Sequence, residues 1–191
     1  MRIHHAAAAV TSAAMLAALT GCFGPSEVTT EPNKPAAKAA DEAKAPAEKK
    51  AAKVAAVGDT ITLTGHDEGL KVDATLKQWL DPAKSADQYI QPQDGKRWVA
   101  AQFELVNTGT AVYDDSPSNG TQVADADGQR FHSGYGEISA GPLMTSAAKV
   151  PPGDKVLGWI VYEVPKDSKI TKVQFGLDSG FANQTGQWAV K

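Results

Sequence analysis

The stretch RWVAAQFELVNTG, residues 97–109, decides the fold class of this chain. Between Trp98 and Val106, apolar side chains alternate with Gln102 and Glu104, which is the period of a half-buried β-strand and not of a helix. The apolar face of this strand is formed by Val99, Ala101, Phe103 and Leu105. Asn107 and Gly109 follow, and these residue types commonly form the turns that end strands. We therefore expect a long strand over residues 98–106.

The same alternation recurs through the C-terminal two thirds of the chain. Further strands are predicted over residues 59–64, 70–76, 121–124, 129–131, 155–164, 170–177 and 186–190. Turn sequences at residues 125–128 and 151–154 separate some of them. Residues 155–164 are apolar on both faces, which is typical of a central strand or of one shielded by a loop. Residues 81–89 are the best helical candidate and would form at most a turn or two.

Short alternating strands joined by frequent turns predict an all-β domain, an antiparallel β-sandwich. A closed barrel is the alternative. We assign residues 57–191 to this domain, a length that suffices for one hydrophobic core. Its 12 basic and 17 acidic residues give a formal charge of 12 − 17 = −5. Nucleic acid is therefore not an expected partner, because nucleic-acid binding needs a basic surface.

The first residues have the composition of a secretory signal. A short polar head carrying Arg2 precedes the apolar residues 6–19. This apolar core is shorter than the roughly 20 residues that a membrane-spanning helix needs. We expect residues 1–21 to be a signal peptide, and a buried apolar helix is the alternative.

The predicted signal ends in Leu19-Thr20-Gly21-Cys22, and Cys22 is the only cysteine of the chain. The four residues resemble the lipobox of bacterial lipoproteins. In that family the cysteine receives a diacylglyceryl group and becomes the first residue of the mature protein. The resemblance implies that Cys22 carries a lipid anchor in a membrane outside the cytoplasm, and stable anchoring needs about two acyl chains.

Residues 22–56 are predicted to be a disordered tether that begins at the lipidated cysteine. After Phe23 the segment consists mainly of Ala, Lys, Glu, Pro and Thr, and it cannot bury enough apolar area to offset chain entropy. Part of it, residues 35–54, is helix-prone although Pro46 interrupts it. A stable docked helix is the alternative, but the segment has no apolar stripe.

Several stretches of the domain together resemble a known family. They are residues 57–60 (VGDT), 97–109, 125–131 (DADGQRF) and 152–165 (PGDKVLGWIVYEVP). In this order they are similar to the telokin-like domain of bacterial surface lipoproteins, a domain of unknown function. That family is grouped with the mycobacterial immunoprotective extracellular antigen. The resemblance covers most of residues 57–177 and implies an immunoglobulin-like β-sandwich outside the cytoplasm, with no catalytic residues.

Few residues fit a metal site or a catalytic site. His66 and His132 are the only histidines after the signal, whereas zinc needs three or four ligands. Residues 125–128 (DADG) match the start of a calcium loop without its later ligands, so an incidental calcium site stays an alternative. Ser133 beside His132 lacks the sequence setting of a catalytic nucleophile. We expect no enzyme activity, no metal and no cofactor.

Five aromatic side chains are candidate binding residues: Trp79, Tyr89, Trp98, Tyr135 and Trp159. Trp98 and Trp159 are out of phase with the core residues of their strands, which predicts that they face away from the main core. Exposed aromatic residues are a usual means of contacting carbohydrate or protein. The alternative is a second cluster packed under the loop of residues 81–95.

We expect a lipid-anchored, extracytoplasmic lipoprotein whose non-catalytic sandwich contacts an envelope protein or peptide. Edge-strand addition is one route, and residues 78–96 and 132–150 are the variable surfaces. The alternatives are a module that binds a small ligand or glycan, and an envelope hydrolase. A flat polar surface would favour protein contact, and a pocket lined by two or more of the five aromatics would favour a small ligand. A cluster of His132 with an aspartate and a serine would favour the hydrolase.

Overall fold

Strand β4 (Lys96–Asn107) runs through the middle of a four-stranded antiparallel sheet. Strands β3 (Lys71–Leu80) and β9 (Lys155–Pro165) pair with its two edges, and β2 (Thr60–Thr64) pairs with β3. The order in this sheet is β2-β3-β4-β9. The four apolar side chains predicted to share one face of β4 are all at most 1% exposed. The predicted strand is therefore confirmed, with its apolar face in the core.

The computed structural model describes residues 54–191. The predictions for the signal peptide of residues 1–21, the lipobox and Cys22 lie outside the described residues, as does the tether up to residue 53. The described chain begins with β1 (Ala55–Ala56), which pairs in parallel with β11 (Thr185–Ala189). Within the described residues, this strand lies just before the predicted domain boundary at residue 57.

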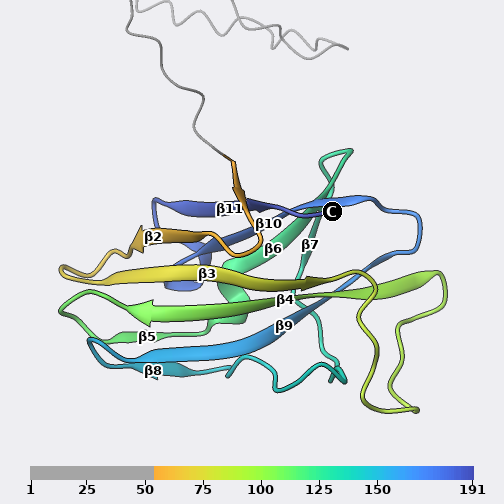
Figure 1. The fold of residues 1–191 in the computed structure, drawn as a ribbon, viewed down its shortest axis with the longest axis horizontal. Coiled ribbons are helices and arrows are strands. Elements are labelled where there is room, and N and C mark those ends of the chain that lie inside the picture. Colours follow the sequence, from red (N-terminus) through yellow and green to blue (C-terminus); the bar gives the residue numbers. More distant parts are fainter. Residues whose placement is uncertain (1–53) are drawn as a thin grey trace, which may run out of the picture. The chain divides into compact units, whose positions relative to one another are not determined.

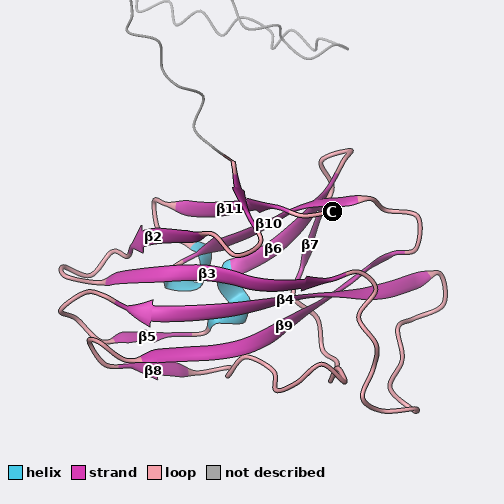
Figure 2. Cartoon of the chain, viewed as in Figure 1, coloured by secondary structure: helices cyan, strands magenta, loops and turns pink. Residues whose placement is uncertain are grey.

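A second sheet has the order β1-β11-β10-β6-β7. Its remaining members are β6 (Thr121–Asp125), β7 (Arg130–His132) and β10 (Ile170–Gly176). A separate two-stranded sheet joins β5 (Tyr113–Asp115) to β8 (Ala148–Val150). All strand pairs except β1 with β11 are antiparallel. Within residues 54–191 the helical structure consists of two short 3₁₀ turns, η1 (Pro117–Gly120) and η2 (Asp178–Gly180), as Figure 2 shows.

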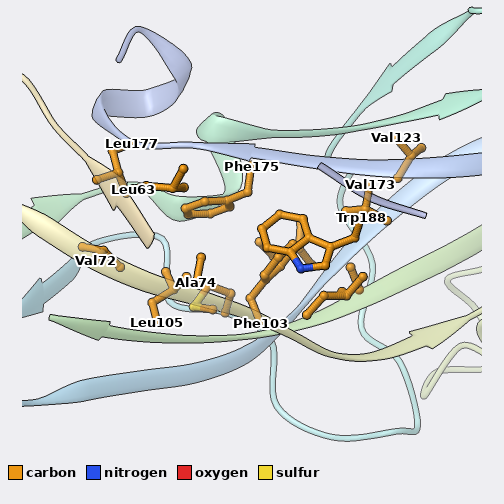
Figure 3. Packing of buried hydrophobic residues seen from close by; sticks show 14 of the residues in the cluster. Leu63, Val72, Ala74, Phe103, Leu105, Val123, Val173, Phe175, Leu177 and Trp188 are labelled. Carbon is orange, nitrogen blue, oxygen red and sulfur yellow. The ribbon is translucent and has the colours of Figure 1, made fainter. Parts of the chain in front are cut away.

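The two larger sheets face each other as the layers of a sandwich (Figure 1). Aromatic side chains from both layers meet in the core between them (Figure 3). The ring centroid of Phe103 lies 5.2 Å from that of Phe175 and 5.4 Å from that of Trp188. Aromatic pairs at these separations add to the stabilisation that their burial provides. The antiparallel β-sandwich is confirmed, and the described strands do not form the alternative closed barrel.

The predicted helical turn in residues 81–89 is wrong, because these residues form an irregular loop. Within it, Ser85 Oγ lies 2.8 Å from the carbonyl oxygen of Asp87 and 2.6 Å from that of Ile90, to either of which its one proton can be donated, and it accepts from the Asp87 amide. Such local side-chain bonds compete with the backbone pattern of a helix. Strand β3 also extends four residues past its predicted end at Leu76, because an irregularity in register there resets the alternation.

Candidate functional site

A second apolar cluster lies on the face of the four-stranded sheet that points away from the sandwich core. Its buried members from the sheet are Trp98, Ala100, Trp159 and Val161, and those from the covering loops are Ala83 and Ile138. Trp98 and Trp159 are each only 2% exposed. The structure thus places these two candidate binding residues beneath loops, where their indole faces are mostly covered.

Two loops cover this cluster and bind each other. In the first, residues 81–95, the Ala86 amide donates to the carbonyl oxygen of Glu137 at 2.9 Å. In the second, residues 133–147, the Ser139 amide donates to the carbonyl oxygen of Lys84 at 3.0 Å. These bonds make the two loops a single cover over the outer face of β4 and β9.

Charged side chains fix the end of the first loop. Glu163 on β9 accepts hydrogen bonds from the Gln93 amide at 3.1 Å, from Lys96 Nζ at 3.0 Å and from Trp98 Nε1 at 3.3 Å. Partial burial raises the pKa of Glu163, but these donors outweigh it and hold the pKa below its ordinary value. The carboxylate therefore ties the loop to the buried Trp98 as well as to its own strand.

The outer edge of β9 is shielded by the second loop. The Trp159 amide donates to the Pro142 carbonyl at 3.0 Å, and the Met144 amide donates to the Trp159 carbonyl at 2.7 Å. Further along, the Gly134 amide donates to the Val161 carbonyl at 2.8 Å. These bonds cover an edge that would otherwise invite pairing with other chains. Strand β9 is therefore an edge strand and not a central one, and the loops over its outer apolar face agree with the other prediction, that a loop shields residues 155–164.

A pocket of about 420 Å³ opens between the two points where the second loop contacts this edge. Its floor is the backbone of β9 from Trp159 to Val161. Its apolar lining residues are Tyr135, Leu143 and Met144, of which Met144 is buried in the main core cluster. Its polar lining residues are Ser116, Ser118, Asn119, Ser133 and Ser146. Among residues 54–191, no charged side chain lines this pocket.

The polar side of the pocket is built by η1 and by its contact with the second loop. Ser133 Oγ donates to the Ser118 carbonyl at 2.8 Å, which joins the loop to η1. By contrast, the hydroxyl groups of Ser116, Ser118 and Ser146 make no hydrogen bond within the described residues. They are therefore available to a ligand.

Of the five predicted aromatics, two line this pocket. Tyr135 stands at its rim with a fully exposed side chain, and Trp159 contributes to its floor. Tyr89 is 85% exposed at the tip of the first loop, outside the pocket. Trp79 is half-buried, packs against the main core and lines a different pocket beside β1 and β11. Trp98 lies in the second cluster.

Of the pocket serines, the sequence analysis considered only Ser133, as a catalytic nucleophile, and it missed Ser116, Ser118 and Ser146. Their stretches have only the composition of ordinary loops, and no local pattern places η1 next to β9. A second polar pocket on the outer face of the other sheet includes His132, Gln122 and Gln174. No hydrogen bond within the described residues joins His132 to an aspartate or a serine.

The residues considered for a metal site or a catalytic site lie elsewhere in the domain. His66 lies near Asp178, with Nδ1 3.4 Å from Oδ2, and it is half exposed. Asp125 Oδ1 accepts from the amides of Asp127 and Gln129, so it closes the turn that its sequence predicts. Within residues 54–191 no three His, Cys, Asp or Glu side chains are grouped to hold a metal ion. Nor does any helix in this range have the length and apolarity to cross a membrane.

Comparisons with known proteins find one matching family and several solved structures of similar fold. A family model described as "Domain of unknown function (DUF4352)" matches residues 68–185. The structure is similar to ycdA from Bacillus subtilis, a candidate lipoprotein, with 12% identity and a TM-score of 0.51. That match covers 69% of this chain but 38% of ycdA, so the chain spans little more than a third of that protein. Among curated proteins, none matches significantly.

Two further solved structures are similar with slightly lower scores. The secreted protein MPT63 from Mycobacterium tuberculosis has 17% identity and a TM-score of 0.49, and the match covers 72% of this chain and 96% of MPT63. The yjhA protein from Bacillus subtilis has 12% identity and a TM-score of 0.49, with 72% of this chain and all of yjhA covered.

Proposed function

Since the chain belongs to the family described as Domain of unknown function (DUF4352), whose description assigns no activity, we propose a function from its own residues. The protein is a lipid-anchored extracytoplasmic module that binds a ligand and catalyses no reaction. Its sandwich carries the binding site, and the segment before β1 links that domain to the membrane.

The anchor is supported by the sequence before the described domain. Leu19-Thr20-Gly21-Cys22 follows an apolar stretch and is followed by a segment with little capacity to fold. The description of ycdA as a candidate lipoprotein is in keeping with this proposal. We also propose that the domain is related to the telokin-like domain of bacterial surface lipoproteins, which its sequence resembles.

A single observation carries the binding function. The pocket on the edge of β9 is lined by both Tyr135 and Trp159, has free hydroxyl groups and has no charged side chain. Its volume lies within the range of about 300–1,000 Å³ that is usual for ligand sites. A hollow lined by two of the predicted aromatics favours a small neutral ligand or a glycan over flat protein contact.

Contact with an envelope protein is the second candidate. Tyr89 and Ile90 are adjacent, 85% and 52% exposed, at the tip of the first loop. Neighbouring exposed apolar side chains mark surfaces where proteins associate. This surface is separate from the pocket, so the two candidates can be tested with different variants.

A fragment screen by NMR tests whether the pocket binds neutral ligands. The full chain, labelled with ¹⁵N and held in dodecylphosphocholine micelles, is titrated with a library of small uncharged compounds. We expect the hits to shift the amides of Ser118, Ser146 and Val161 together. If hits fall elsewhere, or none is found, the pocket is not the binding site.

The anchor is tested separately with Cys22→Ser. This variant should lose membrane association or retain residues 1–21, because no thiol remains for the lipid. Mass spectrometry of the N-terminal peptide distinguishes these results. Recovery of Cys22→Ser in the membrane fraction at the mature size would contradict the proposed anchor.

A further inference from the structure

The floor of the β9 pocket presents one backbone donor, the amide of Val161. The amide and carbonyl of a residue in a strand point to the same side, and the Val161 carbonyl accepts from Gly134 in the second loop. The Val161 amide therefore points outward from β4, toward the pocket that this residue lines. It donates to no other described residue. A buried amide of this kind is costly to leave without an acceptor.

The neighbouring positions of the edge are already occupied. Pro142 and Met144 bind the backbone of Trp159 on one side, and Gly134 binds the Val161 carbonyl on the other. An extended peptide added to a sheet edge pairs with several successive residues. Here the opening offers one amide only, so it suits a ligand with a single carbonyl in the right place better than a peptide strand.

The rest of the pocket defines the remaining chemistry of that ligand. Three serine hydroxyls without partners, on Ser116, Ser118 and Ser146, match hydroxyl groups. Leu143, 41% exposed, offers apolar contact for a methyl group, and the exposed ring of Tyr135 at the rim offers a stacking face. The lack of charged lining residues disfavours phosphate, carboxylate or ammonium groups, which would lose water without gaining a counter-charge.

We propose that this pocket binds a neutral sugar that carries an N-acetyl group. The N-acetyl carbonyl accepts from the Val161 amide, its methyl group packs against Leu143, and the sugar hydroxyls bind the serines. The ring of Tyr135 covers one face of the sugar. This assignment rests on the proposed binding function and names the ligand class for the same site.

The test compares three probes on the ¹⁵N-labelled full chain in dodecylphosphocholine, a detergent without sugar. The first is N,N′,N″-triacetylchitotriose, the second is cellotriose, which lacks acetyl groups, and the third is N-acetyl-dialanine amide. We expect saturable shifts of the Val161 amide with triacetylchitotriose. Binding of cellotriose should be at least about tenfold weaker, because it leaves this amide without an acceptor.

Two tyrosine variants provide a matched pair. Tyr135→Ala should weaken binding of triacetylchitotriose by about five- to tenfold, the usual effect of losing one aromatic contact. Tyr89→Ala removes another exposed ring, which lies outside the pocket, and should leave binding unchanged. Both side chains are exposed, so neither change should alter the melting temperature.

Each alternative outcome overturns a definite part of the assignment. Equal binding of cellotriose would reject the N-acetyl group while keeping a sugar site. Preference for the acetylated dipeptide would replace the sugar by a peptide. If neutral fragments bind the pocket in the screen described above but triacetylchitotriose does not, the ligand class is wrong and the binding function stands. If neither binds, both are wrong.

Discussion

The hydroxyl of Tyr162 on β9 and that of Thr121 on β6 lie 2.5 Å apart and join the two layers of the sandwich inside the core. Thr121 Oγ1 also donates to the Gln174 carbonyl at 2.8 Å. A threonine hydroxyl has one proton, so Tyr162 must be the donor in the pair. Burial raises the pKa of Tyr162 above its ordinary value, which keeps this proton in place.

This order of donors predicts unequal effects of two substitutions. Tyr162→Phe removes the bond to Thr121 but leaves the bond of Thr121 to the Gln174 carbonyl. It should lower the free energy of unfolding by about 0.5–1.5 kcal/mol. Thr121→Val leaves the buried Tyr162 hydroxyl without an acceptor and should cost more, about 1–3 kcal/mol. Urea unfolding of both variants measures the difference. A larger loss for Tyr162→Phe would contradict the assigned direction.

Arg97 holds the start of the first loop to the end of β9. Its guanidinium binds both carboxylate oxygens of Asp81, at 2.6 and 2.8 Å, and donates to the carbonyls of Pro165, Lys166 and Ser168. Lysine cannot reproduce this planar fork of donors. We expect Arg97→Lys to lower the free energy of unfolding by about 1–2 kcal/mol, a figure reduced for partial solvent exposure.

The control for Arg97→Lys is a salt bridge between two solvent-exposed side chains. Lys149 and Asp114 are 3.5 Å apart, with side chains 75% and 64% exposed. Exposed pairs contribute little to stability. Lys149→Ala should therefore leave the melting temperature close to that of the wild type. If Arg97→Lys and Lys149→Ala lowered the stability equally, the hydrogen bonds of Arg97 to backbone carbonyls would contribute nothing to it.

Gly158 allows the second loop to approach β9. A Cβ at this position would lie 2.5 Å from the Met144 amide nitrogen and still closer to its Cα, both backbone atoms. We expect Gly158→Ala to displace residues 142–144 and to destabilise the fold by about 1–3 kcal/mol, as overpacking does. Gly134, on the same edge, has no atom nearer than 3.8 Å to an added Cβ, so Gly134→Ala should be tolerated. Thermal unfolding of the two variants compares them directly.

The sequence predicts the long strands well because their alternation reflects the sandwich itself. In β4 the apolar positions of one face are buried by the opposite sheet, and local spacing is enough to show this. The three-residue strands β5 and β8 have no such signal, since their pairing depends on contacts distant in sequence. Residues 81–89 were misjudged because the hydroxyl of Ser85 binds its neighbours and favours a loop.

The candidate site was predictable only in its aromatic part. The alternation of residues along β4 and β9 correctly predicts that Trp98 and Trp159 face away from the main core. It cannot show that two loops cover them. Tyr135 carries no local mark that separates it from Tyr89, although only Tyr135 lines the pocket. The Val161 donor depends on where the loop leaves the strand, which is a property of the tertiary structure alone.

The lowered pKa of Glu163 predicts a particular dependence of stability on pH. In the unfolded chain this carboxyl titrates near its ordinary value of about 4.3. Because the folded value is lower, its contribution is fully present above about pH 4.3 and is lost as the pH falls through the folded value. Glu163→Gln should therefore flatten the fall of the melting temperature below about pH 4.3.

A spectroscopic signal separates Glu163 from other carboxylates. Trp98 Nε1 donates to Glu163, so in the wild type its ¹H–¹⁵N resonance should shift as Glu163 is protonated, and in Glu163→Gln it should not. Glu104, whose pKa is also lowered, chiefly by its hydrogen bond from Lys155, is the control. Glu104→Gln should flatten the pH profile of stability too, yet leave the titration of Trp98 intact. A Trp98 resonance that stays constant from pH 6 to about pH 3 in the wild type would refute the coupling of this loop to Glu163.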